Sequence, residues 1–370
     1  MRSKRVLFVI NTLGRGGAER SLINLLSQKR FSRMEVDLLI LTGMGELVTE
    51  LPPYVHVINR HVDRISVLSA TGRLFLAAKS AASLLHGGYL IREHSYLSAN
   101  YRHMKRNGRI RYDRLLWDAI SRAAPPVRKK YDEAVAYIEG GSAYYVSRRV
   151  RAKKKTAIIH VDYRKAGYSR LTDGDIWKEF DRIGAVSEDT LYSFKKVYPE
   201  LSDRLFIYEN PLNKDRIKRL AEKDIHLHFK KNVLRIFTAM RLVPQKSPEL
   251  SVNAAAILKE KGISFEWILA GDGEERSRLT SLIKEKGLSD CFILTGLLDN
   301  PYPLMKECDL YVQVTAFEGK SMSVREAMAL GKTVMVTDTG SDRKDTLEIA
   351  VKPSPEALAS AIISFQESRG

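Results

Sequence analysis

The fold is decided by residues 5–28, RVLFVINTLGRGGAERSLINLLSQ, near the start of the sequence. The strand predicted at 5–10 has an unbroken apolar run at 6–10, rich in valine and isoleucine, which is typical of a parallel strand buried on both faces. A glycine-rich loop follows at 11–17, and the apolar spacing from 18 to 28 indicates a helix. A strand, a tight loop and a helix in this order predict an α/β domain with a doubly wound parallel sheet.

The same alternation continues along the chain in two series. In the first series we predict further strands at 36–42, 55–59, 133–138, 156–161, 182–186 and 205–209. A polar, lysine-rich stretch at 211–232 is interpreted as a linker. In the second series we predict strands at 233–239, 265–270, 291–294, 310–315 and 333–337, and helices at 248–261, 274–286, 302–307, 323–330 and 355–368. The two series predict two Rossmann-like domains, residues 1–212 and 213–370, facing each other across a cleft.

The composition agrees with two globular domains. The chain has 370 residues, of which 44% are hydrophobic and 28% charged, and these values exclude wholesale disorder. Cys291 and Cys308 form no metal-binding or CxxC pattern, so a disulfide scaffold is excluded and a reducing cytosol is expected. The first apolar run is too short for a signal peptide, and no run reaches the length of a membrane span, so we predict neither.

The charge is strongly positive. Lys and Arg number 61 against 44 Asp and Glu, a net charge of +17, and residues 102–155 alone hold 16 against 5. Such a field attracts nucleic acid, anionic lipid or phosphorylated substrates. Aromatic residues are thinly interleaved and no nucleic-acid motif is present. A basic face on anionic lipid explains the same charge, and a merely solvated face is the remaining alternative.

The glycines of the first loop, Gly14, Gly16 and Gly17, are candidate ligand contacts. Glycine lets the backbone approach a ligand, and the amino terminus of the following helix favours an anion. Glu19 stands where a dinucleotide motif has its third glycine, and the second strand has no terminal acidic residue, so an NAD site is not favoured. The loop is expected either to hold a phosphate or sugar or to be an ordinary tight turn.

Two cations follow the strand predicted at 233–239. Arg241 and Lys246 therefore lie at its carboxyl end, where open α/β sheets bind ligands. A guanidinium fork and an ammonium on one loop can hold a diphosphate, although a solvated basic loop is equally compatible with the pair alone. Gly271, in a Gly-Asp-Gly sequence directly after the next strand, is either a turn residue or a nucleotide contact.

The most specific segment is FEGKSMSVREA at 317–327. Its candidate ligand residues are Glu318, Gly319, Lys320, Ser321 and Glu326. Amides at 319 and 321 would lie at the positive end of the next helix, which suits a diphosphate. Glu318, in the loop, can accept hydrogen bonds from sugar hydroxyls, and Glu326, expected in the first helical turn, can bridge both hydroxyls of a ribose. Because Ser323-x-x-Glu326 is also a capping box, Glu326 alternatively closes its own helix start.

Three histidines are possible ligand residues. His160 ends a predicted strand, where a lone histidine is more commonly structural, although it could instead touch a donor sugar. His226 and His228 lie in the predicted linker without further ligands, so a metal site is not favoured.

In combination, these motifs resemble the retaining glycosyltransferases of family 4, which have the GT-B fold. The resemblance extends over nearly the whole chain. It rests on Gly14–Glu19 (G-x-G-G-A-E), Ser187-Glu188, Asn210-Pro211, Arg241–Lys246 (R-L-x-x-x-K), Gly271–Gly273, Asn300–Tyr302 and Glu318–Glu326, which follow the family's order. Each motif is weak to moderate alone, and their order makes the signal strong.

The resemblance implies a role for each candidate residue. Gly16 and Gly17 would lie near the donor phosphate or sugar, Arg241 and Lys246 would neutralise the departing nucleoside diphosphate, Glu318 would hold sugar hydroxyls, Glu326 the ribose, and His160 would lie near the donor sugar. No metal ion or other cofactor is expected, because the cations and the helix end replace it.

The resemblance also implies the activity: transfer of a hexose with retention, from a nucleotide sugar of UDP rather than GDP, to a glycan or lipid-linked acceptor in cell-surface polysaccharide synthesis. The first domain would bind the acceptor and the second the donor. We expect a cytoplasmic protein, peripheral on the inner face of an anionic membrane, with no nucleic-acid partner. The family's carboxyl-terminal crossover to the first domain is expected to be short or absent. A nucleotide-sugar epimerase of the same fold and a basic nucleic-acid-binding protein are the alternatives.

Overall fold

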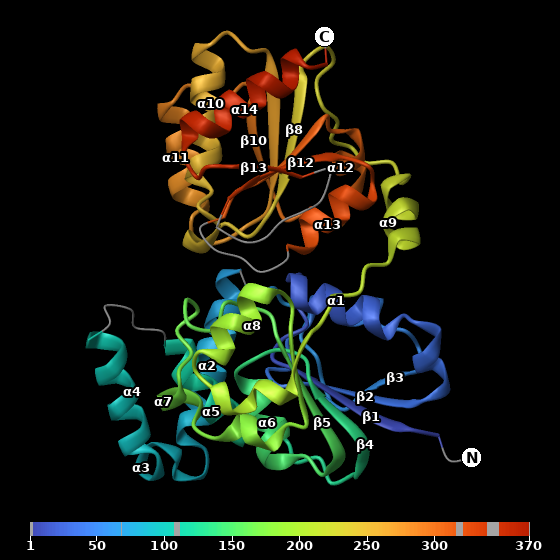
Figure 1. Ribbon diagram of the computed structural model, residues 1–370, viewed down its shortest axis with the longest axis vertical. Helices are drawn as coiled ribbons and strands as arrows, with labels where there is room; N and C mark the ends of the chain where they lie inside the picture. The colour runs from blue at the N-terminus through green and yellow to red at the C-terminus, as the bar shows by residue number, and fades with distance from the viewer. Residues whose placement is uncertain (1–2, 68, 107–111, 316–320, 339–347, 370) are drawn as a thin grey trace. The chain divides into compact units, whose positions relative to one another are not determined.

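The computed structural model describes residues 3–67, 69–106, 112–315, 321–338 and 348–369. The chain divides into two units, Met1–Pro211 and Leu212–Gly370. Each unit is built around one parallel β-sheet with helices on both faces (Figure 1). The prediction of two Rossmann-like α/β domains is therefore confirmed.

The first unit has a seven-stranded sheet in the order β3-β2-β1-β4-β5-β6-β7. Its strands are β1 (Arg5–Ile10), β2 (Glu35–Ile40), β3 (Val55–Val57), β4 (Tyr131–Ala136), β5 (Ala152–Ile159), β6 (Arg182–Ala185) and β7 (Leu205–Ile207). Its α-helices are α1 (Gly17–Leu26), α2 (Ala70–Leu85), α3 (Tyr89–Arg92), α4 (His94–Arg106), α5 (Tyr112–Ala123), α6 (Gly141–Arg149), α7 (Arg170–Asp173) and α8 (Glu188–Lys195).

Strand β1 is central because its side chains fill both cores. Leu7 and Val9 belong to the core that α5 and α6 cover, whereas Val6, Phe8 and Ile10 belong to the core that α1 covers. All five are at most 2% exposed. A strand buried on both faces reads as a continuous apolar run, which is why this strand could be predicted to the residue.

The second unit has a six-stranded sheet in the order β10-β9-β8-β11-β12-β13. Its strands are β8 (Leu234–Ala239), β9 (Phe265–Ala270), β10 (Phe292–Gly296), β11 (Leu310–Gln313), β12 (Thr333–Thr337) and β13 (Glu348–Val351). Its α-helices are α9 (Lys214–Ala221), α10 (Glu249–Glu260), α11 (Arg276–Glu285), α12 (Tyr302–Glu307), α13 (Met322–Ala329) and α14 (Pro355–Glu367).

Each sheet has a switch point, where successive connections leave in opposite directions. In the first unit it lies between β1 and β4, and in the second between β8 and β11. Ligands of open α/β sheets bind outside the carboxyl ends of the strands at such a point. The loops after these four strands are therefore the places where a site is expected.

The interpretation of 211–232 as a linker is wrong, because this stretch contains α9 beside α12 (Figure 1). The side chain of Asn213 caps the helix by accepting a hydrogen bond from the amide of Arg216, at 3.0 Å. Ile217 and Ala221 are buried in the core that α12 and α13 share. Only this narrow face is apolar, so the many charged residues of the stretch concealed the helix.

One stretch bears on the expectation that nothing in the chain spans a membrane. Among the described residues, one helical stretch, Thr71–Arg92, reaches the necessary length and composition over 22 residues. Alanine, serine and glycine residues separate its strongly apolar residues, so the stretch passes on its mean hydropathy and contains no long unbroken apolar run. Gly87 and Gly88, with φ of 56° and 71°, break the stretch between α2 and α3.

Candidate active site

The loop after β8 carries both predicted cations to the switch point of the second unit. Lys246 is buried, at 6% exposure, whereas Arg241 is exposed. The hydroxyl of Thr315, beyond the end of β11, donates to the carbonyl of Gln245 at 3.2 Å. The cationic loop is thereby attached to the neighbouring strand on the far side of the switch point.

A second loop, after β9, packs tightly against the cationic loop. The amide of Leu242 donates to the carbonyl of Asp272 at 2.9 Å. A β-carbon built on Gly271 would lie 1.8 Å from the carbonyl oxygen of Met240, and one on Gly273 would lie 2.2 Å from that of Leu242. The Gly-Asp-Gly sequence is thus required to seat the cationic loop, whatever else its backbone contacts.

Helix α13 begins differently from our prediction. Its N-cap is Ser321, whose carbonyl accepts from the amide of Arg325 at 3.3 Å. Ser323 lies inside the helix, and its hydroxyl donates to Oε1 of Gln313 at 3.0 Å. The capping box expected for Ser323 and Glu326 is therefore not formed. Glu326 lies in the second turn instead of the first, because the helix starts one residue before Ser323.

Glu326 is nevertheless held in one place. Its carboxyl group is buried, at 7% exposure, and its Oε1 accepts a hydrogen bond from the Tyr302 hydroxyl at 3.0 Å. Tyr302 is itself buried and opens α12. The other predicted residues of this segment, Glu318, Gly319 and Lys320, lie outside the residues that the structure describes.

In the first unit, Gly16 is the N-cap of α1 and Gly17 is its first residue. The side chain of Glu19 folds back over this helix start. A β-carbon built on Gly16 would lie 2.3 Å from Glu19 Oε2, and Thr12 donates its hydroxyl to Glu19 Oε1 at 3.0 Å. A carboxylate already occupies the positive end of α1, so this place is less suited to a phosphate than the sequence indicated.

A second glycine loop, which we did not predict, lies beside the first at the switch point. It follows β4 and contains Glu139 and Gly141. The side chain of Asn11 joins the two loops: its Nδ2 donates to the carbonyl of Glu139 at 3.0 Å, and its Oδ1 accepts from the amide of Ser142 at 2.8 Å. The signal was present in the sequence, because Glu-Gly-Gly follows a predicted strand at 133–138 just as the first loop follows 5–10.

His160 lies one residue beyond the end of β5, close to this second loop. Its amide donates to the buried carboxylate of Glu139 at 2.9 Å, and its ring lies 5.5 Å from that of Tyr137. Burial lowers the pKa of His160 to about 4, although a hydrogen bond with the Tyr137 backbone acts in the opposite direction. Its Nε2 is buried without a hydrogen-bond partner among the described residues. The imidazole is therefore neutral near pH 7 and presents a bare nitrogen.

The lowered pKa predicts how stability depends on pH. Below pH 6.5 the unfolded chain binds a proton at residue 160, whereas the folded chain binds it only near pH 4, so His160 destabilises the fold as pH falls through this window. We expect the wild type to lose about 3 kcal/mol more than His160→Gln between pH 7 and pH 4. Urea unfolding followed by circular dichroism at both values measures this difference, and equal losses in the two proteins would contradict the prediction.

The geometry of the second unit can now be compared with known proteins. Residues 220–369 match the glycosyl transferases group 1 family. The match spans nearly all of the second unit. The matched range contains the cationic loop, the Gly-Asp-Gly sequence and Glu326 together.

Individual relatives that resemble part of this chain are glycosyltransferases as well. Over 158 residues the chain is 29% identical to the Campylobacter jejuni N-acetylgalactosamine-N,N'-diacetylbacillosaminyl-diphospho-undecaprenol 4-alpha-N-acetylgalactosaminyltransferase, covering 43% of this chain and 40% of the relative. Over 151 residues it is 31% identical to the amylovoran biosynthesis glycosyltransferase AmsK of Erwinia amylovora, covering 37% and 36%. The chain thus spans less than half the length of these curated relatives.

A solved structure matches over a longer range. Anabaena HepE, crystallised in complex with UDP, superimposes with a TM-score of 0.64 over 99% of this chain and 90% of its own, at 17% identity. This likeness concerns the fold, a pair of Rossmann-like domains of the GT-B type.

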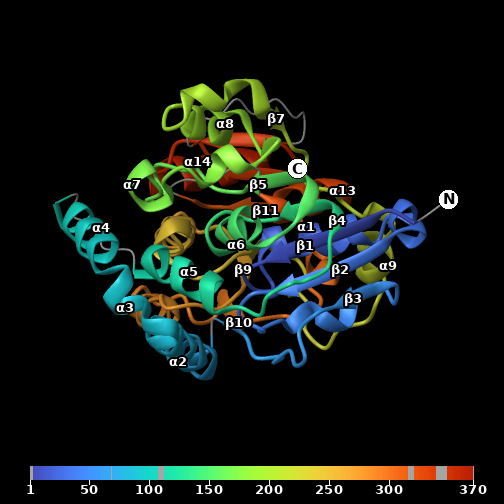
Figure 2. The ribbon, with the colours of Figure 1, turned by 90° about the horizontal axis from the view of Figure 1, so that it is seen from below.

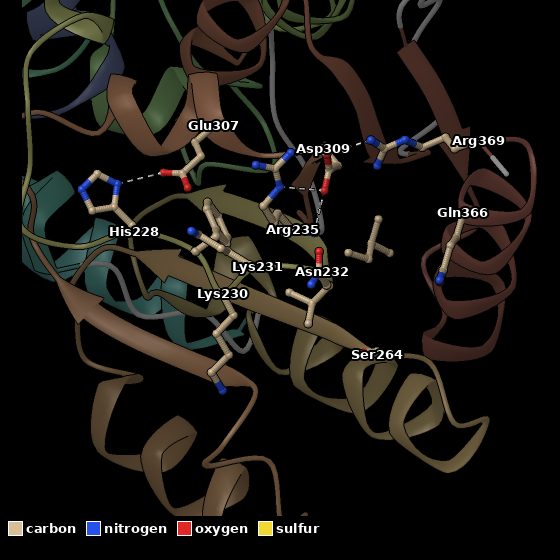
Figure 3. A pocket seen from close by; sticks show the side chains of 13 residues that line it. His228, Lys230, Lys231, Asn232, Arg235, Ser264, Glu307, Asp309, Gln366 and Arg369 are labelled. Atoms are coloured by element: carbon tan, nitrogen blue, oxygen red, sulfur yellow. Dashed lines mark hydrogen bonds and ion pairs between the residues drawn. The ribbon is translucent and has the colours of Figure 1, made fainter.

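A hollow of about 750 Å³ lies elsewhere in the second unit, at the amino-terminal ends of the strands of its sheet (Figure 3). It is lined by residues that precede β8, β9 and β11 and by the end of α14. Its central charges are paired with one another, because Asp309 accepts from Arg235 at 2.7 Å and from Arg369 at 2.8 Å. This hollow is distinct from the switch point and contributes nothing to the candidate site.

His228 also borders this hollow, with its Nδ1 3.4 Å from Glu307 (Figure 3). Within the described parts of the chain, no three His, Cys, Asp or Glu side chains gather in a way that could hold a metal ion.

Proposed function

We propose that this protein is a glycosyltransferase that moves a hexose from a nucleotide sugar, specifically a UDP-sugar, to a glycan or lipid-linked acceptor. The observation that carries the proposal is the cationic loop, which holds a buried Lys246 at the switch point of a group 1 domain and is attached to β11 through Thr315. HepE binds UDP in the same fold, and this similarity supports the choice of nucleotide.

The chemistry follows from the position of the charges. When the bond between sugar and diphosphate breaks, the sugar approaches an oxocarbenium ion and negative charge grows on the diphosphate. Cations placed in advance stabilise that charge more in the transition state than in the ground state. A buried ammonium such as Lys246 acts more strongly than an exposed one, because less water screens it. In this mechanism Arg241 assists from the exposed end of the loop and no metal ion is required.

The remaining contacts are assigned by their chemistry. Glu326 accepts hydrogen bonds from the ribose hydroxyls, and Tyr302 orients its carboxyl group. The bare Nε2 of His160 accepts a hydrogen bond from a hydroxyl of the sugar. Because Glu19 covers the start of α1, the amides of Gly16 and Gly17 are suited to a neutral sugar rather than to the diphosphate. Retention at the anomeric carbon is proposed on the family resemblance.

The cellular role is proposed from the relatives and the charge. The Campylobacter relative is named for a diphospho-undecaprenol acceptor and the Erwinia relative for amylovoran biosynthesis. By analogy, the acceptor here is lipid-linked, the pathway is cell-surface polysaccharide synthesis, and the protein works in the cytoplasm against the inner face of the membrane.

A thermal-shift screen of nucleotide sugars tests the proposal directly. A ligand that binds only the folded state raises Tm by mass action, so UDP-hexoses should raise Tm more than GDP-hexoses. Incubating the stabilising donor without acceptor should leave it intact, whereas an epimerase would isomerise it. If no nucleotide sugar raises Tm, the proposed function is wrong.

Replacing Glu326 by glutamine separates donor binding from stability. The glutamine keeps an oxygen that accepts from Tyr302, so Tm should stay within about 2 °C of the wild type. The Kd for UDP should rise about tenfold, because hydrogen bonds to a charged group are lost. Calorimetric titration with UDP measures the Kd, and Glu285→Gln, on the exposed side of α11, is the matched control. A lowered Tm with an unchanged Kd would assign Glu326 a purely structural role.

A further inference from the structure

The outer side of α2 is apolar, although the solvent side of a surface helix is ordinarily polar. Six exposed residues form an apolar stripe along it, because their spacing of three and four positions places them on one face: Leu74, Ala77, Ala78, Ala81, Ala82 and Leu85. Leu74 and Leu85 are each 71% exposed. Burying such side chains is favourable, so the stripe is expected to have an apolar partner.

The apolar surface continues beyond the break at Gly87 and Gly88. In α3, Leu90 is 42% exposed and Ile91 is 86% exposed. Helices α2, α3 and α4 follow one another along one flank of the first unit (Figures 1 and 2). The apolar stripe and α3 therefore form one continuous feature of the chain.

The charges around the apolar stripe are positive. Residues 69–106 contain six Lys and Arg but only one acidic residue, Glu93, which lies 3.2 Å from Arg122. The exposed cations are Arg73, Arg92, Arg102, Lys105 and Arg106. Apolar side chains flanked by cations match the surface of an anionic membrane, which offers acyl chains next to negative headgroups. A nucleic acid would use the cations but would leave Leu85 and Ile91 in water.

The inner side of α2 decides between crossing the membrane and lying on it. Lys79 donates from its Nζ to the carbonyl of Thr42, and Ser80 and Ser83 are buried against the first unit. Crossing would require α2 to leave the domain, expose these polar groups to lipid and straighten the glycine break. A helix that is packed against its own domain on one side and is apolar on the other is suited to lie in the interface between membrane and water.

We propose that α2 and α3 form an interfacial anchor that inserts Leu85 and Ile91 among the headgroups of an anionic membrane. This anchor is the membrane contact of the proposed function. In every other respect, the existence of the anchor does not depend on that function. Donor binding is measured without lipid, and lipid binding without a donor, so either can fail alone.

Vesicle flotation of the full chain tests the anchor. We expect the wild type to float with vesicles of phosphatidylcholine and phosphatidylglycerol, and to float less with phosphatidylcholine alone or at high salt. The double variant Leu85→Ser, Ile91→Ser should lower the partition coefficient about 10²-fold, because two buried aliphatic contacts are lost. Tyr192→Ser, on α8 and 61% exposed, is the matched control and should bind like the wild type.

The outcomes that would overturn the proposal are equally defined. The proposal is wrong if the wild type does not bind anionic vesicles, or if the double variant floats with them as well as the wild type does. Loss of a lipid-independent dimer in the double variant would show that the apolar stripe covers a second copy of the chain instead. An unchanged Tm and an unchanged Kd for UDP in the double variant would show that the fold and the donor site are intact.

A gain of signal tests the depth of insertion. Ile91→Trp should shift its emission to the blue when anionic vesicles are added, with strongest quenching by lipids brominated near the headgroup. Strongest quenching by bromines at the centre of the bilayer would mean that the stretch crosses the membrane, and would overturn the interfacial anchor.

Discussion

Replacing Lys246 by alanine is expected to lower kcat/KM for sugar transfer by about 10²–10³, the scale of removing one group that stabilises transition-state charge. The reason is the buried position of the ammonium, at 6% exposure, on a loop held to β11 by Thr315. Steady-state kinetics with the donor found in the thermal-shift screen measure the effect.

Two further variants make this result interpretable. Lys284→Ala removes an exposed lysine from the same domain and should keep wild-type kinetics. Arg241→Ala changes an exposed residue of the cationic loop, so it tests that loop without opening a cavity. Near wild-type turnover in Lys246→Ala, with its Tm unchanged, would refute the proposed role of the loop.

Replacing Gly271 by alanine should destabilise the second unit by about 3 kcal/mol, at the upper end of overpacking effects. The new β-carbon would lie 1.8 Å from the carbonyl oxygen of Met240, and backbone cannot move aside as a flexible side chain can. For a domain of this size the shift corresponds to a Tm lower by about 6–12 °C.

The matched control for this glycine is Gly287→Ala. Gly287 also has a positive φ, of 64°, but its β-carbon would meet nothing within 4 Å. The alanine at position 287 should therefore lower the free energy of unfolding only by the backbone strain, about 1 kcal/mol. Calorimetry on both variants separates the effect of the steric clash from that of the backbone strain. Equal decreases in Tm would show that the close approach of the two loops is unimportant.

The sequence identified features that depend on local pattern. Strand β1 was predicted with the bounds that it has, Arg5–Ile10, because a strand buried on both faces is apolar throughout. The positions of Arg241 and Gly271 at carboxyl ends of strands followed directly, since a loop after a parallel strand has only one edge to lie on.

Features that depend on distant contacts could not be predicted. Glu326 is oriented by Tyr302, which is 24 positions away and reaches it only through the packing of α12 beside α13. Ser321 and Ser323 are both possible N-cap residues in the sequence, whereas in the structure Ser321 is the N-cap and the Ser323 hydroxyl donates to Gln313 of β11. Burial, which determines the pKa of His160, likewise has no local signature in a single sequence.

The carboxylate that folds over the start of α1 has a consequence for discrimination among ligands. Any group that approaches these amides must compete with the carboxylate of Glu19. This carboxylate belongs to the same chain, so its effective concentration at the helix start is very high. A fully ionised group suffers most, because like charges would then meet in one small space. In the proposed function, the preference for an uncharged hydroxyl at this place would thus be set by Glu19, a neighbour within the same helical turn, without any distant residue.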